Sequence, residues 1–226
     1  DENNSWLLYG NNENYQGNET DYREPDEISS DTEDYKFENI TKSTLQTEFN
    51  TMISSVIKYK GFYIARYEAG LDKTSKEIVF KNASIEKNNN ITTNANNNET
   101  MNWYGLYKKI KTFTVRNDKI VSSMIWGSQY DAMINWMAKT GKKIGIANDS
   151  KINKDIITGQ SSVDIINNIY DLYGCHYEWT LEAYSNDGRS YRGGIYAYNN
   201  SPANRTRFNP DYENYDGSSR ATLYIK

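Results

Sequence analysis

Residues 168–183 read NIYDLYGCHYEWTLEA, followed by RSYRGGIY at 189–196 and SRATLYIK at 219–226. Aromatic and β-branched residues are frequent in the pieces 176–183, 191–198 and 221–226, and Gly and Pro punctuate the chain between them, so each piece is predicted to form a short strand. Two earlier segments, GFYIARYEAG (61–70) and EIVFKN (77–82), have the same character. The carboxy-terminal part of the chain is therefore predicted to consist of short strands.

Helices are predicted upstream. Ser43 or Thr44 can cap a helix that runs to about Tyr59 and is stopped by Gly61, because apolar residues recur there at helical spacing. A shorter helix is expected over 101–111, with Trp103, Leu106, Tyr107 and Ile110 on one face. A stronger one is predicted after Ser128 as N-cap, stopped by Gly141, with Met133, Trp136 and Met137 forming a core stripe. Helices early and short antiparallel strands late predict a mixed α+β fold.

Three stretches look irregular. Residues 1–35 are acidic, rich in Asn and poor in aliphatics, with Trp6, Leu7 and Leu8 as one docking point, and are read as an arm or linker before a domain at 36–226. The run NNNITTNANNNET (88–100) is read as a surface loop, and residues 142–168 carry no catalytic signature.

Composition excludes several classes of function. The net charge of -4 in 226 residues leaves no basic field for a phosphate backbone, so nucleic acid is not an expected partner. No apolar run approaches the ~20 residues of a membrane span. The single cysteine, Cys175, excludes an internal disulfide and with it the disulfide-stapled scaffolds.

The last quarter of the chain has the composition of a binding surface. Tyr, Asn, Ser, Asp, Gly and Arg crowd it, yet no Lys occurs between Lys154 and Lys226. Tyr gives large contact area with few torsions to immobilise, and Ser, Gly and Asn give adaptable hydrogen bonds, as in antibody paratopes. Lys loses about 1.5–2 kcal/mol of side-chain entropy when fixed, which makes it a poor choice there.

The late motifs together resemble the carboxy-terminal half of formylglycine-generating-enzyme (sulfatase-modifying factor) domains, a branch of the C-type lectin fold. GFYIARYEAG (61–70) and GSQYDAMINWM (127–137) resemble an early strand and the second helix of that family, so the resemblance covers about residues 35–226. It implies a C-type lectin-like fold of the formylglycine-generating subtype. The residues that match the late motifs are Asn168, Tyr170, Asp171, Leu172, Gly174, Glu178, Trp179, Arg192, Gly193, Gly194 and Arg220.

The departures from this family argue against catalysis. The oxygen-dependent enzyme holds copper with a pair of cysteines and iron-dependent relatives need several His ligands, whereas this chain has only Cys175 and His176. We therefore expect no enzyme, no cofactor and no metal. A divergent formylglycine-generating-type enzyme and a calcium-dependent carbohydrate-binding module remain the alternatives, although the sugar-binding EPN or QPD and WND signatures of lectins are absent.

A narrower resemblance is to the variable proteins of diversity-generating retroelements, in which a lectin-fold domain ends in a tract diversified by randomising template adenines. When the adenines of the Asn codons AAC and AAT are randomised, the codons can encode Tyr, Asp, Ser, Arg, Gly, Cys and Phe, but never Lys, Gln, Glu, Met or Trp. Between Ala183 and Ser219 there is no Lys, Gln, Met or Trp, and Glu213 is the only Glu. Cys175 occupies a position where relatives carry Asn.

These arguments predict a non-enzymatic display protein whose variable tract, about 173–218, binds a macromolecular ligand. A protein on a cell or phage surface is the expected partner, and a bacterial cell surface or phage virion the expected extracellular location. The ligand-binding side chains are expected to converge on one solvent-facing patch. They are Tyr173, Cys175, Tyr177, Tyr184, Asn186, Asp187, Tyr191, Tyr196, Tyr198, Asn199, Asn200, Asn204, Thr206, Phe208, Asn209, Asp211, Tyr212, Asn214 and Tyr215.

Other conspicuous residues are assigned to the frame. His176 is expected to pack or to form hydrogen bonds within it, and Gly193 and Gly194 to mark a bulge or close packing. Trp179 and Arg192 are expected to be buried, with Arg192 paired to a carboxylate or to carbonyl groups. Of the carboxylates that could suggest calcium or acid–base chemistry, Asp171, Glu178 and Glu182 are assigned to the frame and Asp187 to the surface.

Overall fold

The computed structural model describes residues 24–31, 40–72, 74–75, 77–80, 101–113, 118–140, 157–160, 164–195, 202–212 and 217–226. Within these ranges the chain is a mixed α+β fold, as expected. Its helical elements are the 3-10 helix η3 (Ser29–Asp31), α1 (Lys42–Tyr59), α2 (Trp103–Lys111) and α3 (Gly127–Lys139).

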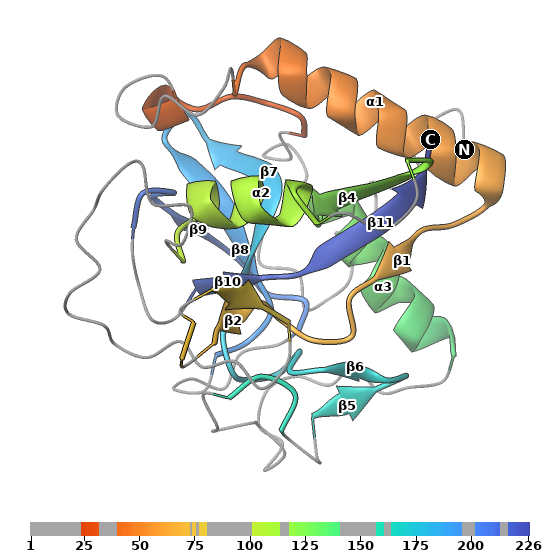
Figure 1. The fold of residues 1–226 in the computed structure, drawn as a ribbon, viewed down its shortest axis with the longest axis vertical. Helices are drawn as coiled ribbons and strands as arrows, with labels where there is room; N and C mark the ends of the chain where they lie inside the picture. The colour runs from red at the N-terminus through yellow and green to blue at the C-terminus, as the bar shows by residue number, and fades with distance from the viewer. Residues whose placement is uncertain are drawn as a thin grey trace.

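The strands form two main sheets and two small hairpins (Figure 1). One sheet is antiparallel with the order β1-β11-β4, and the other has the order β10-β7-β8-β9, in which only β10 and β7 run parallel. The pairs β2–β3 and β5–β6 stand apart. The strands are β1 (Tyr63–Ile64), β2 (Gly70–Leu71), β3 (Ile78–Val79), β4 (Ile120–Met124), β5 (Ile165–Ile166), β6 (Ile169–Tyr170), β7 (Tyr177–Ser185), β8 (Gly188–Arg192), β9 (Arg205–Phe208), β10 (Gly217–Ser219) and β11 (Ala221–Ile225).

Helix α1 begins earlier than expected. Its N-cap is Thr41, whose side chain accepts a hydrogen bond from the Thr44 backbone N–H at 3.1 Å. Ser43 and Thr44 lie inside the first turn, so the predicted cap is wrong by two or three residues. The helix ends at Tyr59 because Lys60 adopts the left-handed conformation (φ 63°), and Gly61 is not the stop.

Helix α3 also begins before its predicted cap. Trp126 is the N-cap, and its backbone N–H donates to the Gln129 side chain at 3.1 Å, so Ser128 lies in the first turn. Met133 and Met137 are buried as expected, but Trp136 is 48% exposed, which corrects its assignment to the core. The predicted stop, Gly141, lies outside the described residues.

Segment 61–70 is not one strand. Only β1 and β2 are regular, and between them the chain still pairs with the carboxy-terminal strands. The Ala65 N–H donates to the Ala221 carbonyl, and the Ala69 N–H donates to the Ser219 carbonyl, both at 2.8 Å. The predicted strands at 176–183 and 221–226 correspond to β7 and β11, and that at 191–198 ends at Arg192 in β8 as far as it is described.

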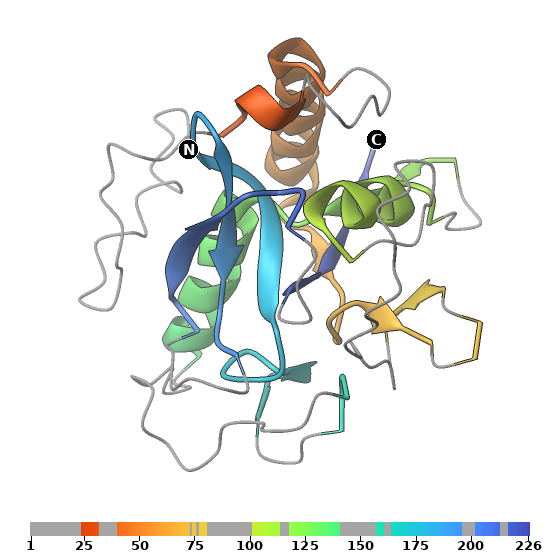
Figure 2. The same ribbon diagram turned by 90° about the vertical axis from the view of Figure 1, so that its left-hand side faces the viewer.

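The core lies where the helices meet the two sheets. Helix α2 contacts β4 and β7, and α3 contacts β7 and β8. Three buried indoles, Trp103, Trp126 and Trp179, are fully covered there. Figures 1 and 2 show α1 at one end of the molecule and the β5–β6 hairpin at the other. The four-stranded sheet therefore packs against α2 and α3, and the turn between its strands β7 and β8 carries part of the candidate site.

Candidate ligand-binding surface

Four buried arginines hold the carboxy-terminal strands in place. Arg189, Arg192, Arg205 and Arg220 are at most 2% exposed, a burial that a guanidinium tolerates only with paired charges. Arg192 forms ion pairs with Asp131 of α3 and, at 3.8 Å, with Glu182 of β7. Arg192 and Trp179 are thus buried, and Arg192 is paired with a carboxylate, as predicted.

Arg220 joins the two sheets. Its guanidinium donates to the Glu178 carboxylate at 2.6–3.1 Å and to the carbonyl oxygens of Ala65, Arg66 and Tyr170 at 2.8–3.1 Å. Burial alone would lower the pKa of Arg220, but the Glu178 carboxylate raises it above its usual value. Glu178, Glu182 and Asp171 are all buried, as a place in the frame requires.

An aromatic row runs from the core to the surface across β7, β8 and β9. Tyr191 stacks on Tyr177 with ring centroids 5.4 Å apart, contacts Trp179 at 3.7 Å, and contacts Phe208 at 4.8 Å. Phe208 in turn stacks on Tyr212 at 5.8 Å, and Tyr212 is 47% exposed. The expectation that Tyr191 faces solvent is wrong, because it is buried in the middle of this row.

Cys175 is also buried, with no exposed surface, which corrects its expected exposure. Its backbone is left-handed (φ 61°), a region where Asn is more common than Cys. Its sulfur and the carboxylate oxygens of Glu68 and Asp171 lie within 4.8 Å of one another, a donor set able to bind a divalent cation. The Arg220 Nη2 atom, 3.9 Å from Glu68 Oε1, already supplies positive charge there.

Besides the positive charge of Arg220, protonation can offset the burial of the Glu68 carboxyl group. Burial, followed by the charges of Glu178 and Asp171, raises the pKa of Glu68 well above its usual value. Asp164 lies beside the same loop and was not singled out from the sequence, because it falls in a stretch without periodicity. Its carboxylate accepts from the Tyr173 and Gly174 N–H groups at 2.8 and 3.0 Å, and burial raises its pKa to about 7. Asp164 therefore positions the loop before β7.

The exposed residues of the tract lie mainly at one end of the sheet. Asn186 and Asp187 form the turn between β7 and β8, and Asp187 pairs with Arg207 of β9. A hydrogen bond of 2.7 Å from Ser185, followed by the charge of Arg207, lowers the pKa of Asp187. Arg207, itself exposed, was missed from the sequence because an isolated Arg in a polar tract gives no signal.

A second group lies toward the other end of the same strands. Asn204 accepts a hydrogen bond from the Gly193 N–H at 3.2 Å, and a Cβ on Gly194 would lie 2.2 Å from the Tyr173 carbonyl oxygen, which confirms close packing at the glycine pair. Because the pairs Arg189–Phe208 and Arg192–Arg205 are three positions apart, the two groups are separated by about 10 Å. The described candidates therefore spread along β7–β9 in two groups.

The structure sorts the predicted ligand-binding residues into four sets. Buried are Cys175 and Tyr191. Half-buried are Tyr173, Tyr177, Tyr184, Asn204, Thr206, Phe208 and Asp211. Exposed are Asn186, Asp187, Asn209 and Tyr212. Outside the described residues are Tyr196, Tyr198, Asn199, Asn200, Asn214 and Tyr215.

Residues 24–31, which fall within the predicted arm, lie against the exposed turn (Figure 2). The Ser29 N–H donates to the Asn186 carbonyl at 2.7 Å, and Arg189 donates to the Asp26 carbonyl at 2.7 Å. Arg189 is also paired with the buried carboxylate of Asp31. This segment therefore supports the β7–β8 turn from outside the tract.

The chain matches no family model, no curated protein and no solved structure. In the ranges that the structure describes, no helix has the length and hydrophobicity that a membrane crossing requires.

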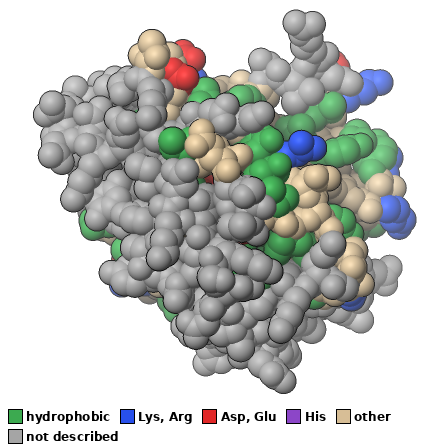
Figure 3. All heavy atoms as spheres, turned by 90° about the horizontal axis from the view of Figure 1, so that it is seen from below, with side chains coloured by type: hydrophobic (Ala, Val, Ile, Leu, Met, Phe, Trp, Pro, Cys, Tyr) green, Lys and Arg blue, Asp and Glu red, His purple; other side chains and the backbone are tan. Residues whose placement is uncertain are grey.

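On the described part of the face shown in Figure 3, Lys and Arg side chains lie singly, and hydrophobic side chains cover more of the surface than charged ones.

Proposed function

We propose that this chain is a non-enzymatic ligand-binding domain with a C-type lectin-like fold of the formylglycine-generating subtype. Its variable tract, about residues 173–218, supplies the recognition surface and is diversified by adenine-directed retroelement mutagenesis. The proposed ligand is a protein on a cell or phage surface, and the proposed location is the exterior of a bacterial cell or a phage virion.

One observation carries the proposal. Most of the frame residues matched in the resemblance are buried, and Arg220 links Glu178 to the Tyr170 carbonyl. By contrast, the exposed polar and aromatic residues Asn186, Asp187, Asn209 and Tyr212 lie on loops at the end of that frame. A rigid scaffold that presents replaceable loop residues is the usual arrangement of a recognition domain. The aromatic row supports it, because Phe208 and Tyr212 extend the packed core outward as anchors.

The origin of the tract can be tested in the DNA that flanks the gene. We expect a near-copy of the segment coding for residues 170–220 that differs almost wholly at adenines, next to a reverse transcriptase gene. A neighbourhood without such a copy would remove the proposed diversification, although the domain could still bind a ligand.

Three measurements separate the binding function from its rivals. Purified protein should hold no stoichiometric copper, iron or zinc and should not convert cysteine-containing peptides to formylglycine. On a glycan array, we expect no calcium-dependent binding, that is, no glycan signal that disappears when a chelator is added. Bound redox metal with turnover would favour the enzyme, and chelator-sensitive glycan binding would favour a calcium-dependent lectin.

A further inference from the structure

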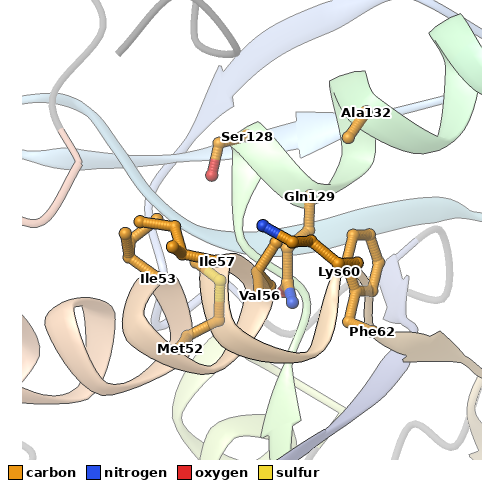
Figure 4. Close-up of a pocket in the computed structure, with 9 residues that line it drawn as sticks. All are labelled: Met52, Ile53, Val56, Ile57, Lys60, Phe62, Ser128, Gln129 and Ala132. Carbon is orange, nitrogen blue, oxygen red and sulfur yellow. The ribbon is translucent and has the colours of Figure 1, made fainter. Parts of the chain in front are cut away.

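An apolar groove lies between α1 and α3 (Figure 4). Ile53, Val56 and Ile57 of α1 line one side, and Ser128 and Ala132 of α3 line the other, around a cavity of about 320 Å³. The groove is separate from the ligand-binding surface proposed above, which lies on the loops of β7–β9. An inference about it does not depend on that proposed function.

Apolar side chains in and beside this groove are left open to solvent. Ile57 is 52% exposed, and Trp136 is 48% exposed one helical turn after Ala132. Residues four apart lie on the same side of a helix, so Trp136 extends the apolar side of α3 that carries Ala132. Large exposed apolar groups next to a groove mark a place where another segment binds.

The chain itself leads into this groove. The Glu24 carboxylate accepts hydrogen bonds from the Ser128 N–H at 3.1 and 3.3 Å, and Ser128 lines the groove. Glu24 is where the described part of the chain begins, so residues 1–23 are covalently joined to the domain beside the α3 side of the groove. In those residues Leu7 and Leu8 are the only aliphatic side chains, and Trp6 precedes them directly.

Length and charge favour this segment as the occupant. Residues 9–23 connect Leu8 to Glu24 and span up to about 50 Å when extended, or about 20 Å as a flexible coil. The lined stretch from Met52 in α1 to Lys60, directly after the helix, is about 12 Å long, which is well within reach. The Lys60 side chain also lines the groove, and the segment Asp1–Glu2 that precedes Trp6 is acidic. Tethering raises the effective concentration of such a segment to the millimolar range.

We propose that Trp6, Leu7 and Leu8 bind in the groove between α1 and α3, so that the amino-terminal arm folds back on its own domain. The apolar triplet covers Ile57 and Trp136, and Glu24 fixes the point at which the arm leaves α3. In this arrangement the arm stays on the α1–α3 side, away from the loops of β7–β9.

Paramagnetic relaxation tests the proposal in the full chain. A nitroxide is attached at Ser5→Cys in a Cys175→Ser background, and the Ile53 and Ile57 methyl signals are recorded by NMR with selective isotope labelling. We expect both signals to broaden strongly and to sharpen on reduction of the nitroxide. Replacing Trp6, Leu7 and Leu8 together by Ser should abolish the broadening, whereas replacing Asn12, Asn14 and Gln16 together by Ser should leave it.

A mixed sample distinguishes an arm that binds the groove of its own molecule from an arm that binds the groove of a second copy. Spin-labelled protein without isotopes is combined with isotope-labelled protein without the nitroxide, and the proposal predicts no broadening between molecules. Broadening in this mixture would overturn it in favour of a second copy in the groove. Unaffected Ile53 and Ile57 signals in the singly labelled chain would overturn it in favour of an external partner.

Discussion

Arg192 of β8 and Asp131 of α3 form a buried ion pair that ties the helix to the four-stranded sheet. Replacing Asp131 by Leu should lower the unfolding free energy by about 3–5 kcal/mol, because it leaves a buried guanidinium short of a partner. Urea unfolding measures the loss. Asp187→Asn, in the exposed pair with Arg207, is the matched control and should leave the urea midpoint nearly unchanged. Equal midpoints for the two variants would contradict the role given to Arg192.

Gly217 makes room for the aromatic row. A Cβ at this position would lie 2.2 Å from Tyr191 Oη and 3.0 Å from Trp179 Nε1, so Gly217→Ala should lower the unfolding free energy by about 1–3 kcal/mol. Gly61→Ala is the control, since a Cβ there meets nothing within 4 Å. Adding Tyr191→Phe to Gly217→Ala removes the clashing hydroxyl and should restore part of the loss in thermal unfolding. No recovery would show that the hydroxyl is not the obstacle.

Asp164 predicts a dependence of stability on pH. Burial raises its pKa in the folded chain from the usual 3.8 to about 7, so the folded chain holds this proton more tightly than the unfolded chain does. The stabilisation that protonated Asp164 adds to the unfolding free energy is therefore fully present below about pH 4 and is lost as the pH rises to about 7. Asp164→Asn should flatten the fall in unfolding free energy over that range. A wild-type stability that rises more steeply than that of the variant between these pH values would refute the assignment.

Cys175 should be unreactive in the folded protein. Its side chain is fully buried, so a thiol reagent such as Ellman's reagent should label it slowly in buffer and rapidly in denaturant. The ratio of the two rates is the measurement. Rapid labelling of folded protein would return Cys175 to the exposed set that the sequence favoured.

The sequence predicted the fold class and the carboxy-terminal strands because aromatic and β-branched residues mark β7 and β11 clearly. It misplaced the start of α1 because Thr41, Ser43 and Thr44 are all good caps, and only the backbone geometry selects one. It could not separate Tyr191 from Tyr212, since both sit among polar residues and burial depends on pairing across strands. The ion pair between Asp31 and Arg189 spans 158 positions, so nothing local in the acidic arm indicates it.

The exposed residues of the tract should be replaceable without loss of the fold. Randomising Asn186, Asn209 and Tyr212 together should leave most variants folded, because exposed positions usually change the unfolding free energy by within about 0.5 kcal/mol. Surface display with a conformation-sensitive protease assay measures the folded fraction.

A second library at Cys175 and Tyr191 is the contrast. Both side chains are buried, so most members should be cleaved, since truncating a large buried side chain costs about 3–5 kcal/mol.

The library at Asn186, Asn209 and Tyr212 should also yield binders when selected against an arbitrary folded protein. A library at exposed Thr47 and Thr51 of α1 should yield fewer, because a flat helix surface offers less adaptable contact area. If the exposed positions of the tract give no more binders than the α1 positions, the described end of β7–β9 is not the recognition surface.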